Sequence, residues 1–268
     1  MVAAALGLLL LLASSAATAD AAAPCSARVS VEPERAFIGQ LVLWRAEILR
    51  RSDVREVDWR RAPRFVGFRA EWLPGETLPE PIDRDGGRWR ASRERRALFP
   101  ARTGRLEIPA ASLDCDGERV EVAGASLEVL PLPDVGRPPG FSGLVSPVRV
   151  TTRLVPERIA LGQTAQLWIL VRGGGNVWNT APPLRENSLP GVDVFAEPPT
   201  TDIDADRNFV ARRTFRYRIV PRNPGRVGLP EVAVPWFDPE TRTYQQARGP
   251  ARTLVVEGTA ILAAEETP

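Results

Sequence analysis

Apolar and polar residues alternate over short segments of this chain, and a period of two is the pattern of half-buried β-strands. It covers residues 42–48, 165–171 and 215–219. The 26 prolines and 21 glycines separate such segments at the intervals that turns require. No long segment outside the N-terminal apolar run has a convincing helical period. The pattern therefore predicts an all-β chain.

Three groups of residues occur twice, in the same order and at nearly the same spacing. The first group, PERAFIGQ at 33–40, recurs as PERIALGQ at 156–163, an offset of 123 residues (156 − 33 = 123). The other two are WRRAP, which recurs as WNTAP, and Pro-x-x-x-Gly-Arg-x-x-x-Pro; they lie at 59–63 and 178–182, and at 100–109 and 221–230. The chain is therefore two copies of one unit, each about as long as an immunoglobulin-like β-sandwich.

The repeat sets the domain organisation. We expect two tandem immunoglobulin-like β-sandwich domains, joined by a connector that its prolines make semi-rigid. The predicted order is a signal peptide (1–23), the first sandwich (24–131), the Pro/Gly-rich connector (132–147), the second sandwich (148–257) and a polar tail (258–268).

The repeated residues also predict local structure. A Gly-Gln pair before a strand suits a tight turn in which the glycine has positive φ. The motif Pro-x-x-x-Gly-Arg predicts a strand end, a loop and a short strand bounded by prolines. Aligning the copies places Trp44 and Leu167 on the inward face of their sheets and Trp168 on the outward face.

The N-terminal segment has the features of a secretion signal, although no basic residue precedes its apolar run. Leu6 to Ala13 is too short to span a membrane, and small residues follow it, with cleavage expected after Ala19 or Ala23. Pro24 before Cys25 argues against a lipoprotein anchor. We expect a periplasmic protein that meets the membrane only indirectly, through partners.

The two cysteines fit an oxidising compartment. Cys25 and Cys115 are candidates for one disulfide that joins the start of the first domain to one of its late strands. Two free buried thiols are the alternative.

Charge argues against nucleic-acid binding. All 35 cations are arginines, they are interleaved with 33 acids, and the net charge is +2. Nucleic-acid binders usually gather basic charge on one face. The densest arginine run, 88–96, is expected to be a solvated edge strand in preference to an anion site.

The composition excludes several kinds of catalytic and metal sites. The sequence contains no histidine, which excludes histidine-based triads and histidine metal sites, and two cysteines are too few for structural zinc. A glycosidase needs only two carboxylates, but no pair stands out. We expect no enzyme activity and no cofactor.

Two further motifs have unremarkable explanations. The run Gly173-Gly174-Gly175-Asn176 lacks the residues of a phosphate loop and is expected to be a hairpin or bulge. The series Asp202, Asp204 and Asp206 has calcium-loop spacing but lacks the loop's glycine and terminal acid. We expect a polar hairpin tip there.

The sequence resembles the BatD, or oxygen-tolerance, family from about residue 28 to 256. The resemblance lies in Phe141-Ser142-Gly143, the run 173–176, Pro221 with Gly225 and Pro230, and Trp236-Phe237-Asp238-Pro239 with Thr241 and Tyr244. Members commonly carry a membrane span after their sandwich domains, whereas this sequence shows none.

The resemblance implies a non-enzymatic envelope protein that works alongside von Willebrand factor A-type partners in aerotolerance or envelope stress. It implies no catalytic residues. Trp168, Trp178 and Asp238 are candidate partner contacts, because aromatic residues dominate binding hot spots and a ligand carboxylate can reach a partner's metal. Packing against the neighbouring domain explains either tryptophan equally well. A carbohydrate-binding or carbohydrate-active sandwich is the alternative function.

Overall fold

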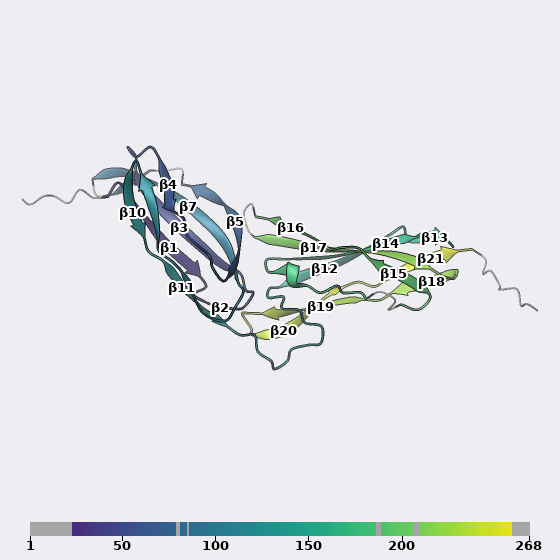
Figure 1. Ribbon diagram of the computed structural model, residues 1–268. Helices are drawn as coiled ribbons and strands as arrows, with labels where there is room; N and C mark the ends of the chain where they lie inside the picture. Colours follow the sequence, from purple (N-terminus) through teal and green to yellow (C-terminus); the bar gives the residue numbers. More distant parts are fainter. Residues whose placement is uncertain (1–22, 79–80, 85, 186–188, 206–208, 259–268) are drawn as a thin grey trace, which may run out of the picture.

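The computed structural model describes residues 23–78, 81–84, 86–185, 189–205 and 209–258. Except for Ala23 and Gly258, the predicted signal peptide and polar tail lie outside these ranges. Asp206 also lies outside them. The described residues are almost all strands and turns, and they form two β-sandwiches that follow one another along the molecule (Figure 1).

One layer of the first domain is a five-stranded antiparallel sheet in the order β1-β3-β7-β5, with β6 also paired to β7. Its strands are β1 (Cys25–Glu32), β3 (Val42–Arg51), β5 (Phe68–Thr77), β6 (Ile82–Arg84) and β7 (Gly87–Pro100). The opposite layer contains two three-stranded sheets, β10-β9-β4 and β2-β11-β8. Its strands are β2 (Arg35–Phe37), β4 (Val57–Arg61), β8 (Gly104–Ile108), β9 (Ala111–Cys115), β10 (Glu118–Val122) and β11 (Ala125–Leu130).

The second domain repeats this arrangement. Its first layer has the order β12-β14-β17-β15 with β16 paired to β17, and its second layer contains the sheets β13-β21-β18 and β19-β20. The strands are β12 (Val148–Val155), β13 (Arg158–Ala160), β14 (Ala165–Gly173), β15 (Val192–Ala196), β16 (Thr200–Asp204), β17 (Val210–Pro221), β18 (Gly225–Leu229), β19 (Val232–Asp238), β20 (Thr243–Gly249) and β21 (Arg252–Glu257).

The strand order confirms the predicted fold class, which is two tandem immunoglobulin-like β-sandwich domains. Each strand of the first domain has a counterpart in the second except β4. A short 3-10 helix, η1 (Val177–Asn179), follows β14 in place of that strand. Among the described residues, no helix has the length and hydrophobicity that a membrane crossing requires.

The repeated turn before β3 and β14 has the same hydrogen bonds in both domains. The Gln40 backbone N–H donates to Phe37 O at 3.0 Å, and the Gln40 side-chain oxygen accepts from the Phe37 N–H at 2.9 Å. Gln163 makes both bonds with Ala160, each at 3.0 Å. The glycine between them has φ of 78° in the first domain and 91° in the second. Only glycine adopts such angles readily, which explains why the Gly-Gln pair recurs.

The alternating residues fill the sandwich cores as predicted. Trp44 and Ile169 are fully buried on the inner faces of β3 and β14, and Tyr217 lies in the second core with its hydroxyl accepting a hydrogen bond from the Leu184 N–H at 3.3 Å. Burial raises the pKa of the Tyr217 phenol, so this side chain stays neutral. Trp168 lies on the outer face of β14, half-buried, as the alignment predicts.

The expectation for the arginine run at 88–96 was wrong. It forms most of β7, which is a central strand between β3 and β5. The strand tolerates these charges because acids on its neighbours pair with them: Arg93 with Glu47 at 3.6 Å and Arg95 with Glu76 at 3.0 Å. The arginine run predicted an edge strand because the sequence pattern does not show that carboxylates of adjacent strands neutralise it.

Candidate functional site

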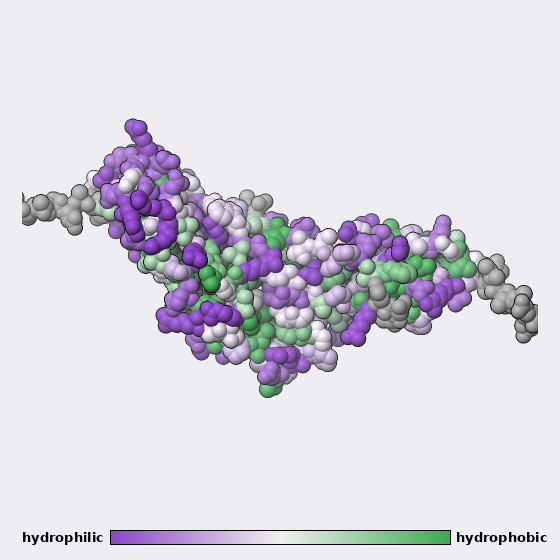
Figure 2. Space-filling view, in the orientation of Figure 1, coloured by the Kyte–Doolittle hydropathy of each residue, from purple (hydrophilic) through white to green (hydrophobic). Residues whose placement is uncertain are grey.

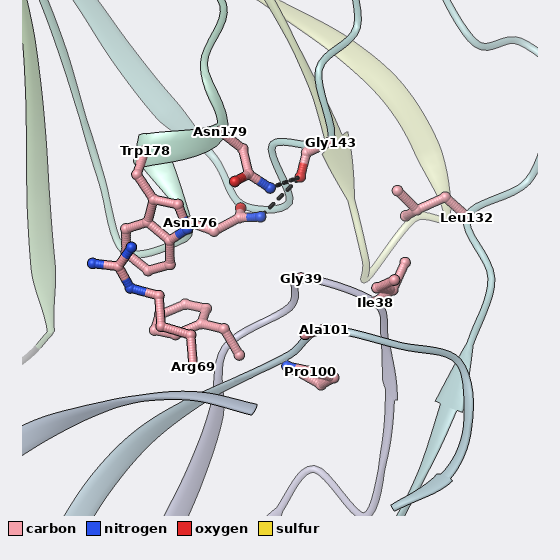
Figure 3. A pocket seen from close by; sticks show the side chains of 11 residues that line it. Ile38, Gly39, Arg69, Pro100, Ala101, Leu132, Gly143, Asn176, Trp178 and Asn179 are labelled. Atoms are coloured by element: carbon pink, nitrogen blue, oxygen red, sulfur yellow. Dashed lines mark hydrogen bonds between the residues drawn. The ribbon is translucent and has the colours of Figure 1, made fainter. Parts of the chain in front are cut away.

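The two domains meet at an aromatic contact around Trp178. Its indole packs edge-on against Phe99 of β7, with ring centroids 4.7 Å apart, and Phe209 lies 5.1 Å from Phe99. The Arg69 guanidinium stacks on the indole at 3.9 Å (Figure 3). The carbonyl of Trp178 accepts a hydrogen bond from Arg213, which anchors η1 to its own domain. Trp178 is therefore a domain-packing residue, one of the two explanations that the sequence left open.

The glycine run 173–176 holds the connector against the second domain. The Asn176 side chain accepts a hydrogen bond from the Val145 N–H at 2.7 Å and donates one to Gly143 O at 2.8 Å. A Cβ on Gly175 would overlap Ser146 and the carbonyl of Val145, so only glycine fits there. The run is a bend leading into η1. The expectation of a hairpin or bulge was wrong, because close approach of the connector explains these glycines.

The hairpin β19–β20 forms the other side of the joint. Phe237 packs edge-on against Phe37 of the first domain at 4.8 Å, and its N–H donates to Leu144 O at 2.8 Å. Tyr244 packs against Phe141 of the connector at 4.9 Å, and its hydroxyl donates to Pro133 O. Hydrophobic residues accordingly gather where the two domains meet (Figure 2).

Several of the residues that carry the family resemblance lie at the interdomain joint, whereas Pro221 and Pro230 flank β18 and Gly225 is its first residue. Phe141, Gly143, Asn176, Phe237 and Tyr244 all contact the connector or belong to it. Both polar atoms of the Asn176 side chain are hydrogen-bonded to the connector, which stabilises the joint. A cleft of about 330 Å³ remains beside it, lined by Ile38, Phe99, Trp178, Asn179 and neighbouring residues (Figure 3).

Trp168 has a different setting from Trp178. It lies on the outer face of the second domain, where the Arg216 guanidinium is 5.5 Å from its ring. A shallow depression of about 270 Å³ surrounds it, lined by Thr151, Arg153, Leu170 and Thr214 among others. No described residue of the first domain or the connector lines this depression. Trp168 is therefore the aromatic candidate that remains available for a partner.

Asp238 is held in a turn. Its carboxylate accepts a hydrogen bond from the Glu240 N–H at 3.0 Å, as its position before Pro239 predicts. Asp202 and Asp204 lie on β16, beside Arg212 of β17. Most of the segment between β16 and β17, where the polar hairpin tip is predicted, falls outside the described residues. Within the described ranges, no group of three or more His, Cys, Asp or Glu residues is placed to hold a metal ion.

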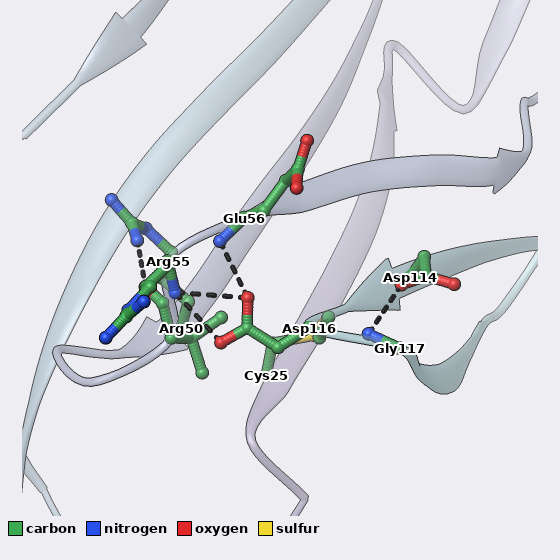
Figure 4. The surroundings of a disulfide bond; sticks show 9 residues. Cys25, Arg50, Arg55, Glu56, Asp114, Asp116 and Gly117 are labelled. Carbon is green, nitrogen blue, oxygen red and sulfur yellow. Dashed lines mark hydrogen bonds between the residues drawn. A yellow bond between two sulfur atoms is a disulfide. The ribbon is translucent and has the colours of Figure 1, made fainter.

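The far end of the first domain is closed by a disulfide between Cys25 of β1 and Cys115 of β9. The next residue, Asp116, accepts hydrogen bonds from the backbone N–H groups of Arg55 and Glu56 at 3.0 and 2.9 Å (Figure 4). These bonds hold the pKa of Asp116 below its usual range because they stabilise the ionised carboxylate. This end of the first domain is largely hydrophilic in Figure 2.

Other shifted pKa values have structural causes. The Arg222 guanidinium lowers the pKa of Asp193 through an exposed ion pair. Burial lowers the pKa of Arg96, whose guanidinium stacks on Trp72 at 3.4 Å and lies 3.5 Å from Glu94. Glu94 also accepts a hydrogen bond from Trp59 Nε1 at 2.9 Å. Trp59, Glu94 and Arg96 thus interact on the side of β7 that faces the first core, whereas Trp72 is exposed.

Sequence reasoning missed the arginines around Trp168 and the role of Asn176. The arginines could have been found by assigning alternate residues of β12 and β17 to the outer face, which places Arg149, Arg153, Arg212 and Arg216 there. Asn176 gave no such signal, because the connector carbonyl and N–H that it bonds lie more than thirty residues away in sequence.

No protein-family model matches this sequence, and no curated protein matches it. Similar solved structures include two proteins of Yersinia pseudotuberculosis and invasin. The chain is 12% identical to the adhesin InvE of Yersinia pseudotuberculosis over 85% of its own length and 58% of that chain, with a TM-score of 0.25. InvD of the same organism gives 11% identity, 90% and 60% coverage, and a TM-score of 0.25. Invasin, a bacterial integrin-binding protein, gives 12% identity, 86% and 40% coverage, and a TM-score of 0.17.

The chain thus spans about three fifths of the two Yersinia pseudotuberculosis proteins and less of invasin. At these TM-scores the likeness carries no functional argument.

Proposed function

We propose that this chain is a non-enzymatic, periplasmic protein-binding component of the cell envelope. In this proposal it acts in aerotolerance or envelope stress alongside von Willebrand factor A-type proteins, as its resemblance to the BatD family implies. The joint holds the two sandwiches against each other. In this proposal, partners bind on the surfaces of the sandwiches. The absence of histidine from the sequence supports a role without catalysis.

One observation carries the proposal: Trp168 lies half-exposed in a shallow depression on an uncovered sheet face. Tryptophan is the residue type most enriched in binding hot spots, and a flat sheet face with an aromatic centre suits a protein partner. The equivalent outer face of the first domain is partly covered, because Leu73, Ala97 and Phe99 pack against the second domain.

A photo-crosslinking amino acid at position 168 tests this directly. Position 45, which is equivalent in the repeat (45 + 123 = 168), is the matched control. The protein is expressed in its own cells, irradiated, and its crosslinked partners are identified by mass spectrometry. We expect a von Willebrand factor A-type protein joined at position 168 and not at 45. Equal crosslinking at both positions, or none at 168, would contradict the proposal.

A carbohydrate-binding function is the second candidate. The observation that favours it is the same indole, since sugar rings stack on exposed aromatic side chains of flat sheets. A screen of cell-wall and plant glycans separates the two functions: binding that Trp168→Ala abolishes supports the carbohydrate function, whereas a protein-binding component binds none of them.

A further inference from the structure

Three neighbouring cross-strand rows on the outer face of the second domain's large sheet contain several arginines. The first of these rows contains Arg153, Trp168 and Arg216, which lie side by side on β12, β14 and β17. One neighbouring row contains Thr151, Leu170 and Thr214, and the next contains Arg149, Arg172 and Arg212. Arginines therefore surround a small apolar centre made by Trp168 and Leu170.

Most of these arginines have no acidic partner. Among the described residues, no carboxylate pairs with Arg149, Arg153 or Arg172, which are all exposed. Each of the other two has one acid: Arg212 lies 3.9 Å from Asp204 and Arg216 lies 3.2 Å from Glu197. The face therefore carries uncompensated positive charge, although the whole chain is close to neutral.

The same face of the first domain is neutralised. Arg45, the equivalent of Trp168, pairs with Glu32, and Arg93 pairs with Glu47. The repeat offset of 123 residues places Val155 where Glu32 stands and Leu170 where Glu47 stands. Val155, Trp168 and Leu170 thus stand where the first domain has Glu32, Arg45 and Glu47, so this face of the second domain contains neither of those two acids.

We propose that this face, defined by Arg149, Arg153, Trp168, Leu170 and Arg172, binds an acidic polypeptide segment. The inference rests on the proposed function and names the chemistry of the partner. Guanidinium groups form paired hydrogen bonds with carboxylates, and the depression at Trp168 accepts an apolar side chain between them. A site for single-stranded nucleic acid would instead require several aromatic platforms, whereas Trp168 is the one aromatic residue in these three rows and Phe195 in the adjoining row already lies under the Arg218 guanidinium.

The test uses the full chain and a fluorescein-labelled oligoglutamate peptide that contains leucine, with binding followed by anisotropy. The triple variant Arg149→Glu, Arg153→Glu, Arg172→Glu removes the unpaired cations. We expect it to weaken binding at least about tenfold, because charge reversal on a complementary surface replaces attraction by repulsion. Added NaCl should weaken binding by the wild-type protein, since exposed charges are screened.

A second triple variant, Arg28→Glu, Arg64→Glu, Arg90→Glu, provides the matched control. These arginines of the first domain are exposed and pair with no carboxylate among the described residues. Because three arginines are reversed in each variant, the change in net charge is the same. Binding within about twofold of wild type is expected. Circular dichroism melts of both variants verify that each is folded.

Equal losses in both triple variants would overturn the inference, because net charge alone would then explain binding. So would failure of the wild type to bind the peptide, or tighter binding to single-stranded DNA or phosphatidylglycerol vesicles. The proposed function fails separately: a partner crosslinked at position 168 whose capture the first triple variant does not reduce leaves the function intact and refutes the acidic segment. If the peptide binds but no partner is crosslinked at position 168, the acidic-segment inference stands and the proposed function fails.

Discussion

The two domains share one strand order but use the same end for different purposes. In the first domain, the hairpin β9–β10 carries Cys115 of the disulfide, and Asp116 at its tip bonds the backbone of Arg55 and Glu56 in the same domain. In the second, the equivalent hairpin β19–β20 is longer and carries Phe237 and Tyr244, which hold the connector and the first domain. The two copies share the same core architecture, but their loops have diverged. In the first domain this end bonds only to its own domain, and in the second it packs against the connector and the other domain.

Trp59 and Trp178 occupy the same position of the repeat but make different contacts in the two domains. Trp59 donates its indole N–H to Glu94 inside the first domain at 2.9 Å. Trp178 packs instead against Phe99 across the joint. Their shared sequence motif, Trp-x-x-Ala-Pro, reflects common descent of the two units and does not imply a common contact. The surroundings that each domain supplies determine what the side chain does.

The largest expected effect is that of the disulfide, which the second domain lacks. Replacing both cysteines, Cys25→Ser with Cys115→Ser, should lower the unfolding free energy of the first domain by about 4 kcal/mol, since the bond closes a long loop of the unfolded chain. Hydrogen exchange followed by mass spectrometry measures this for β9 and, as an internal reference, for β19. A reductant should lower the hydrogen-exchange protection of β9 in the wild type and leave the double variant unchanged. Equal loss of protection in both domains would show that the bond does not act locally.

The next effect is at the glycine run. Gly175→Ala should destabilise the joint by about 3 kcal/mol, because the new methyl group overlaps Ser146 and the Val145 carbonyl. Gly174→Ala is the matched control: its nearest neighbour would be Phe209 O at 3.6 Å, an ordinary contact. Urea unfolding of both variants provides the comparison. Similar stabilities would mean that the connector does not press on this loop.

The two tryptophans allow a sharper test. Trp178→Ala should cost about 2 kcal/mol and broaden the distribution of interdomain distances, because it removes the aromatic contact between domains. Trp59→Ala should cost a similar amount without changing domain orientation. Small-angle X-ray scattering measures the orientation. An unchanged scattering curve for Trp178→Ala would refute its role in the joint.

The smallest effect is a pH dependence of the stability of the first domain, at the end that carries the disulfide. The pKa of Asp116 is lowered in the folded protein, so its stabilising contribution is complete above the ordinary aspartate pKa and is lost as pH falls through the folded value. Thermal melts from about pH 5 downward should therefore fall less steeply for Asp116→Asn than for wild type.

Asp58→Asn is the control, since its exposed carboxylate accepts no hydrogen bond from the described residues. Its acid profile should match that of the wild type. Identical profiles for Asp116→Asn and wild type would remove Asp116 from the account.

The fold could be predicted from sequence because it depends on local periodicity and a detectable repeat. Trp44 and Tyr217 lie inside for the reason that the alternation gives, and the Gly-Gln turns match the expected backbone. The position of β7 could not be predicted, because its charges are balanced by Glu47 and Glu76 on other strands. Periodicity reports which side of a strand is buried and not which neighbour it has.

The candidate surface was only half predictable. Alternation places Trp168 outside, but it cannot show that the second domain leaves the adjoining sheet face open. Trp178 belongs to the joint for a reason equally absent from the local sequence: its partner Phe99 is in the other domain.

The central claim is that the second domain, and not the first, presents the binding face. Its most direct test is an NMR titration of the full chain with the oligoglutamate peptide, following the indole N–H signals. We expect the Trp168 signal to shift while those of Trp44 and Trp59 stay in place. A stationary Trp168 signal, or equal shifts in both domains, would contradict it.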